Sequence, residues 1–562
     1  MSTIAYTDPA NLNNSQQEQQ QSVELSSESA SSVSKIIVRE IGSFDYGKHD
    51  AFSRLFRSSL WCISNLLYLK VLFELYINNA DPCAMVFPKR TALISYGVLF
   101  LLIILLVNVP ITAAGQDEPP GQAVPLDPLQ IPEDELPAAI NDEDLRIETV
   151  ATGLIHPTAM SFLGSTDDIL VIEKDNGTVR RIIDGQVQQQ PLLDVAVAND
   201  NGTNERGLFG LAVAKQNETT TYVFLYFTES GGGQDGDDAM GVLPAGNRLY
   251  RYELVENGAG ANGSAGELIN PKLLLDLPAR PGPRYNGGPL LIAQGENNAT
   301  ILYLMIGDLD HHTTQAQNYE DGPPPDGTGG ILRIDIEGNP LPNPVLVEPP
   351  DDDNDDDDDN SNEDIGMLPY YFAYGIRNSF GMTFDPVTGY LWDTENGPEY
   401  GDEINLVQPG FNSGWDDIQG LASAAENQGA DIDEDLEDFG GIGSYSDPKF
   451  VWQNPVGVTA IKFLNSTELG IEYENDLFVG DINNGRLYHF EVNEDRTDLT
   501  FDGVLADRVA NNPNELNSVI FGTGFRSISD IEVGPDGHLY LLLYGPGKIL
   551  RIVPQEAQNG DN

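Results

Sequence analysis

The feature that most constrains this chain is a short strand motif, usually led by glycine, that recurs six times. The second residue of each copy falls at position 178, 248, 331, 403, 486 or 548. Short β-rich units repeated at such intervals are typical of radial architectures, in which each unit forms one sheet around a common axis. The copies are Gly177–Ile182, Asn247–Tyr252, Gly330–Ile334, Asp402–Leu406, Gly485–Phe490 and Gly547–Ile552.

Each unit has the same internal order. Two apolar strands separated by a turn come before the repeated motif, and a more exposed fourth strand follows it. The fourth strands are expected at 191–195, 272–276, 370–374, 449–452 and 500–504. The sixth unit lacks a fourth strand of its own, whereas residues 145–150 form an orphan strand before the first unit. This predicts an all-β, six-bladed β-propeller with four-stranded blades, whose ring is closed by that N-terminal strand. A pair of β-sandwich domains is the alternative.

The propeller is expected to occupy 145–554, with a short tail at 555–562. An apolar run at 92–109 follows Lys89 and Arg90, as in a signal peptide or a single membrane anchor covering 85–116. Met85 would be a natural start for such a signal, so residues 1–84 are either a start-site overcall or a disordered and amphipathic preface. Residues 117–144 are rich in proline and acidic residues and are expected to form a stalk.

We therefore expect the propeller to lie outside the cytoplasm, either secreted or anchored by residues 91–109. The formal net charge of −59 argues against nucleic acid or anionic lipid as partners. Ten acidic residues crowd into an insertion at 351–364, which is either a solvated loop or a weak calcium-binding segment. Both cysteines, Cys62 and Cys83, precede the propeller, which excludes disulfides and thiolate chemistry within it.

In a propeller, the loops entering each first strand share a face with the loops between the second and third strands. Most of the unusual polar residues fall in these two sets of loops, and a polar rim over an apolar wall is the usual geometry of a binding site. They include Glu205, Tyr285, Arg377–Asn378, Arg526, His311–His312 and the segment 394–402.

At these loops the chain resembles the quinoprotein glucose/sorbosone dehydrogenases of the soluble aldose sugar dehydrogenase type, which use pyrroloquinoline quinone (PQQ). The resemblance spans about 145–554, and its most specific segments are Tyr374–Gly389, Glu395–Pro398, Gly401–Leu406 and Phe411–Trp415. It implies oxidation of the CH–OH group of a sugar or polysaccharide. A histidine would take the hydroxyl proton and calcium would polarise the quinone, while the electron acceptor stays unknown.

The resemblance also implies roles for individual residues. Arg377, Asn378 and Arg526 would contact PQQ. Calcium would be held by the carbonyls of Gly397 and Pro398 and by the carboxylate of Asp402 or Glu403. Glu205 stands at a family glutamine position.

Several family positions carry different residues here. The position of the catalytic histidine is Tyr285, and a phenol is a poor base at neutral pH. Asn483, Ser527 and Ser529 replace charged residues that meet the PQQ carboxylates. His311 and His312 offer replacement bases. Two functions therefore stay open: a sugar dehydrogenase, or a non-catalytic calcium-stabilised propeller that binds glycans or surface proteins.

Overall fold

The computed structural model describes residues 137–200, 205–256, 266–348, 365–398, 400–426 and 436–555. Within them the protein is an all-β propeller made of six mainly antiparallel sheets. The predicted preface, the signal or anchor segment, most of the stalk, the acidic insertion and all but the first residue of the tail lie outside these residues. Among the described residues, no helix is long and apolar enough to cross a membrane.

The six sheets correspond one to one to the six repeat units. The first strands are β3 (Pro157–Ser165), β8 (Leu208–Lys215), β12 (Leu290–Gln294), β16 (Ser379–Phe384), β22 (Val458–Phe463) and β27 (Ile528–Val533). The second strands are β4 (Asp168–Glu173), β9 (Thr221–Glu229), β13 (Thr300–Ile306), β17 (Leu391–Glu395), β23 (Leu477–Asp481) and β28 (Leu539–Leu543). The repeated motif supplies the third strands: β5 (Thr178–Ile183), β10 (Gly246–Val255), β14 (Gly330–Asp335), β18 (Asp402–Val407), β24 (Leu487–Phe490) and β29 (Lys548–Pro554).

The outer strands complete the sheets. They are β6 (Gln186–Val187), β7 (Leu193–Asp194), β11 (Glu267–Leu277), β15 (Tyr371–Tyr374), β19 (Phe411–Asn412), β20 (Ser444–Tyr445), β21 (Phe450–Trp452), β25 (Val509–Ala510), β26 (Ile520–Thr523), β1 (Ala139–Ile140) and β2 (Leu145–Thr152). The helical segments are α4 (Ala422–Glu426) and the 3₁₀ turns η4 (Asp237–Met240), η5 (Glu296–Asn298), η6 (Gln315–Gln317), η7 (Leu368–Tyr370), η8 (Ile471–Tyr473), η9 (Gly503–Leu505) and η10 (Glu515–Ser518).

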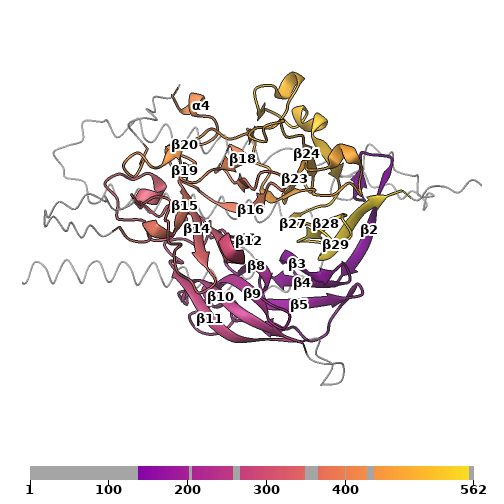
Figure 1. Ribbon diagram of the computed structural model, residues 1–562, viewed down its shortest axis with the longest axis horizontal. Coiled ribbons are helices and arrows are strands. Elements are labelled where there is room, and N and C mark those ends of the chain that lie inside the picture. Colours follow the sequence, from indigo (N-terminus) through magenta and orange to yellow (C-terminus); the bar gives the residue numbers. More distant parts are fainter. Residues whose placement is uncertain are drawn as a thin grey trace, which may run out of the picture. The chain divides into compact units, whose positions relative to one another are not determined.

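The first strands contact one another around a closed ring, in the order β3, β8, β12, β16, β22, β27 and back to β3. The orphan strand β2 pairs with β29 in antiparallel register, from Leu145 opposite Pro554 to Thr152 opposite Lys548. The predicted pairing of the N-terminal strand with the last unit is therefore confirmed. In Figure 1 the indigo strand β2 lies beside the yellow strand β29.

One predicted strand is wrong. The fourth strand of the fifth sheet is β26, not residues 500–504. Residues 493–498 form a tight turn in which the Oδ1 of Asn493 accepts hydrogen bonds from two backbone N–H groups, those of Thr497 and Asp498. This turn brings Leu499 back against Val492, beyond the end of β24. The later segment β26 is therefore the one that pairs alongside β24.

A separate apolar core fills each of the six gaps between neighbouring sheets. Alternate side chains of a second strand face opposite neighbours. In β4, Leu170 and Ile172 pack toward the second sheet, whereas Ile169 and Val171 pack toward the sixth. Because both faces of such a strand are buried, its sequence is a continuous apolar run instead of an alternating one.

Candidate active site at one mouth of the ring

One side chain from each sheet meets at one mouth of the ring. In five sheets the pairing of the first strand with the second skips one residue near the start of the first strand. Such a β-bulge leaves its extra residue unpaired and re-aims the side chain. The bulge residues and Pro289, which directly precedes β12 of the third sheet, line a cavity of about 240 Å³. These residues are Thr158, Phe209, Pro289, Phe380, Thr459 and Ser529.

Loop residues add polar groups to the wall of this cavity. Lys174 follows β4, Glu205 precedes β8 and Tyr544 follows β28. The Nζ of Lys174 lies 2.9 Å from Oδ1 of Asp175 and 5.7 Å from the centroid of the Phe209 ring. The Tyr544 ring stacks on His156 with centroids 4.8 Å apart. An apolar floor with a few charged groups at its edge suits a small polar organic molecule.

Glu205 is fixed at one oxygen only. Its Oε2 accepts a hydrogen bond of 2.5 Å from the backbone N–H of Tyr285 and a longer one, 3.4 Å, from the side-chain amide of Asn378. Within the described residues, Oε1 accepts no hydrogen bond. Burial raises the pKa of the Glu205 carboxyl, although the Tyr285 hydrogen bond and the nearby Arg377 charge oppose that rise.

Tyr285 and Arg377 contact each other beside the cavity, and neither lines it. The guanidinium carbon of Arg377 lies 3.9 Å from the Tyr285 ring centroid and 5.3 Å from that of Trp415. Its Nη1 donates to the carbonyl of Asn396 at 2.7 Å. Arg377 is buried, so the tyrosine ring covers the cation predicted to meet a cofactor. Arg526 is exposed, with a left-handed φ of 75°, and it does not line the cavity.

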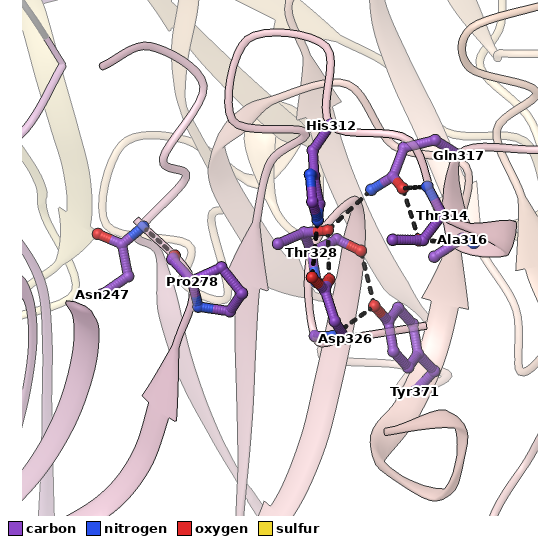
Figure 2. Close-up of polar contacts among 10 residues, drawn as sticks. Asn247, Pro278, His312, Thr314, Ala316, Gln317, Asp326, Thr328 and Tyr371 are labelled. Atoms are coloured by element: carbon purple, nitrogen blue, oxygen red, sulfur yellow. Dashed lines mark hydrogen bonds and ion pairs between the residues drawn. The ribbon is translucent and has the colours of Figure 1, made fainter. Parts of the chain in front are cut away.

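The two loop histidines lie outside the cavity wall. The Nε2 of His312 is 2.7 Å from Oδ2 of Asp326, and this contact raises the pKa of the imidazole. Figure 2 shows Asp326 bonded in turn to Thr328, whose hydroxyl lies 2.7 Å from Oδ1. The exposed His311 ring stacks on Trp415 with centroids 6.3 Å apart. The predicted site therefore divides: Glu205, Tyr285, Arg377 and Asn378 come together, whereas the histidines stand apart from them.

Asp402 and Glu403, the two carboxylates predicted to hold calcium, have different hydrogen-bond partners. Asp402 holds loops together: Oδ1 accepts from the backbone N–H of Gly397 at 2.9 Å, and Oδ2 accepts from those of Val456 and Gly457. Pro398 follows Gly397 in the loop between β17 and β18. Glu403 accepts a 2.7 Å hydrogen bond from the backbone N–H of Gly420.

A buried polar ladder on β17 and β18 includes Glu403. Glu395 lies opposite Glu403 and Asp393 lies opposite Asn405, all four on one face of the strand pair. Burial raises the pKa of Glu395 to about 7 and that of Asp393 and Glu403 well above their usual values. Within the described residues, both carboxylate oxygens of Asp393 and the Oδ1 of Asn405 lack a hydrogen-bond partner. No three acidic, histidine or cysteine side chains of those residues converge in the manner of a complete metal site.

Sequence reasoning missed most of the cavity wall. A bulge changes which residue faces the axis without any distinctive residue type, so Thr158, Phe209, Phe380 and Thr459 carried no signal. Lys174 and Tyr544 were recognisable only as members of the loops on the correct face. Of Asn483, Ser527 and Ser529, the positions where the family carries charged residues, Ser529 lines the cavity. Its hydroxyl donates to the carbonyl of Pro157 at 2.8 Å.

Comparisons with known proteins agree with this architecture. A family model described as Glucose / Sorbosone dehydrogenase matches residues 154–551. The chain is 26% identical over 431 residues to aldose sugar dehydrogenase YliI of Escherichia coli (strain K12), covering 75% of this chain and 94% of that protein. It is 24% identical over 310 residues to quinoprotein glucose dehydrogenase B of Acinetobacter calcoaceticus, covering 53% and 56% of the two chains.

A solved structure is similar in fold. The crystal structure of the soluble aldose sugar dehydrogenase from Escherichia coli in the apo-form superposes with a TM-score of 0.50 at 21% identity. The match covers 73% of this chain and 100% of that one.

Proposed function

This chain belongs to the glucose/sorbosone dehydrogenase family, and we propose that it oxidises the CH–OH group of a sugar with PQQ and calcium. The observation that carries the proposal is the cavity, to which the first strands of five sheets and Pro289 contribute and to which Lys174 and Glu205 add opposite charges. We further propose that the six sheets are the blades of a six-bladed ring. An apolar pocket with few charged groups is the usual site for such a substrate.

The cavity residues fit a planar quinone that carries carboxylates. Phe209 and Phe380 offer apolar ring surfaces, and the ammonium of Lys174 would meet a carboxylate. When bound, PQQ supplies a two-electron acceptor for hydride. Each charge-assisted hydrogen bond contributes roughly 1.5–3 kcal/mol, so the neutral residues at 483, 527 and 529 should weaken its binding.

The buried ladder supports the calcium part of the proposal. An ionised carboxylate without a partner is costly inside a protein, and three neighbouring carboxylates repel one another. A hard cation with oxygen ligands would relieve both penalties. The unpartnered oxygens of Asp393 and Asn405 fit this requirement, and Glu395 and Glu403 on the same face add two further carboxylates. By family resemblance, the carbonyls of Gly397 and Pro398 would also hold calcium.

Export also belongs to the proposal. The apolar segment at 92–109 supports secretion or anchoring outside the cytoplasm, where sugars and free calcium are available. The strongly negative net charge favours a sugar over nucleic acid as partner.

Titration of the purified protein with PQQ, with and without Ca²⁺, tests the proposal by calorimetry. We expect binding that depends on calcium, followed by reduction of a dye acceptor when an aldose is added. Asp393→Asn should weaken the stabilisation by Ca²⁺, seen as a smaller rise in Tm. Absence of PQQ binding and of turnover across a panel of sugars would rule the enzyme out.

A second function is favoured by one observation, the Tyr285 ring that covers Arg377. If the Tyr285 ring keeps Arg377 from contacting a cofactor, the propeller would bind glycans or surface proteins without turnover. Glycan binding with no dye reduction in the same experiment would select this alternative.

A further inference from the structure

Glu205 is the acidic side chain of the cavity wall. The other titratable groups there are Lys174 and Tyr544. Lys174 is paired with Asp175, and a cation accepts no proton. Burial raises the pKa of the Tyr544 hydroxyl, which makes the phenol harder to ionise. Among the described residues that line the cavity, Glu205 is thus the side chain able to accept a proton near neutral pH.

Its geometry is that of a positioned base. The hydrogen bond from the Tyr285 N–H holds Oε2 in place, while Oε1 accepts no hydrogen bond within the described part of the chain. One oxygen is therefore anchored and the other is available to a ligand. General base catalysis needs this arrangement, because the accepting atom must reach the substrate while its carrier stays fixed.

We propose that Glu205 is the catalytic base of this protein, a proposal that rests on the sugar oxidation proposed above. The proton acceptor has moved from the side chain at position 285 to the carboxylate that the backbone of the same residue holds. Tyr285 is then a positioning residue. Its main-chain N–H orients Glu205, and its ring packs on Arg377.

The O–H bond at the anomeric carbon breaks and its proton passes to Oε1 of Glu205. The C–H bond of the same carbon breaks with its electron pair, and PQQ, when bound, would supply the two-electron acceptor for this hydride. A C=O bond forms, so the sugar is oxidised by two electrons to a lactone, and the two electrons would be taken up by the bound quinone.

The charges around Glu205 set its pH dependence. Lys174 follows β4, Arg284 and Tyr285 precede β12, and Arg377 precedes β16. The three cations favour the carboxylate and burial favours the acid, and burial is the larger effect. The reaction rate should therefore rise with pH through a pKa above the ordinary glutamate value.

Glu205→Gln tests the proposal in the full chain loaded with PQQ and Ca²⁺. The amide oxygen of glutamine can still accept the Tyr285 hydrogen bond, so the fold should be kept. We expect kcat to fall by about 10²- to 10⁴-fold, the usual value of a general base. KM for the sugar should change little, and the rise of rate with pH should disappear. Glu205→Gln combined with Tyr285→His should recover part of kcat.

A second measurement needs no turnover. The folded-state pKa of Glu205 is raised, so its ionisation destabilises the fold as pH rises above the unfolded-state value. Glu205→Gln should therefore raise Tm at pH 8 and leave it nearly unchanged at pH 4. If the Glu205→Gln enzyme oxidised sugar at the wild-type rate and with the wild-type pH profile, Glu205 would not be the base. The proposed sugar oxidation itself would be unaffected by that result. An inactive wild-type protein would refute the sugar oxidation itself.

Discussion

Tyr285 illustrates how much the role of a residue depends on its surroundings. Its φ of 58° is left-handed, a conformation that is uncommon outside glycine. Two main-chain bonds hold it there: its N–H donates to Glu205, and its carbonyl accepts from the N–H of Leu309 at 3.3 Å. The backbone at this position thus orders the site, whatever side chain it carries.

The stacking of Tyr285 on Arg377 should be measurable as stability. Tyr285→Ala removes the ring and should cost about 1–2 kcal/mol, the range for a cation–π contact that is mostly desolvated. Tyr285→Phe keeps the ring and serves as the matched control, with a cost close to zero. Urea unfolding followed by fluorescence would give both values. Equal losses in the two variants would contradict a role for the ring itself.

At the scale of the element, the repeated motif has a physical reason for its leading glycine. Gly177, Gly485 and Gly547 have φ of 59°, 61° and 61°. A Cβ at any of them would overlap the backbone of the segment that crosses the start of the third strand, at Val195, Arg526 and Leu154 respectively. The glycine therefore allows both a left-handed turn and a close approach.

Gly547→Ala tests this requirement. The left-handed conformation alone should cost about 1–2 kcal/mol for alanine, and the overlap with Leu154 should add to that. Gly389→Ala is the control, because Gly389 has a φ of 74° and open space at the Cβ position. Denaturant unfolding should show a clearly larger loss for Gly547→Ala. Equal losses would mean that the close approach is unimportant.

At the scale of the whole molecule, stability depends on closing the ring. Strand β2 pairs with β29 along nearly its whole length and covers the last free edge of that sheet. An uncovered edge strand offers unpaired N–H and C=O groups to other chains. The first and last sheets also share a core, which includes Met160 and Leu542.

Truncation from the N-terminus separates this closure from everything that precedes it. A protein beginning at residue 155 lacks β2, whereas one beginning at residue 143 keeps it, and both lack β1. We expect the shorter protein to unfold several degrees lower and to aggregate, because the edge of β29 is open. Calorimetry and light scattering would compare the two. Identical Tm and solubility would show that β2 is dispensable.

The sequence alone determined the all-β architecture, the order of the first three strands of every unit and the closing role of residues 145–152. These depend on local apolar patterning and on turn residues, which one chain displays directly. It also identified the loops that share the site face, including Glu205, Tyr285, Arg377 and Asn378.

Only the tertiary structure decided which of those side chains line the cavity. Bulges at Thr158, Phe209, Phe380, Thr459 and Ser529 depend on the register between strands, which residue type does not reveal. The contact of Arg377 with Tyr285 and the hydrogen bond that anchors Glu205 likewise join segments 80 or more residues apart. On a shorter scale, the backbone N–H of Gly420 folds back to bond Glu403. Packing between distant loops, which no local pattern encodes, therefore sets the chemistry of this site.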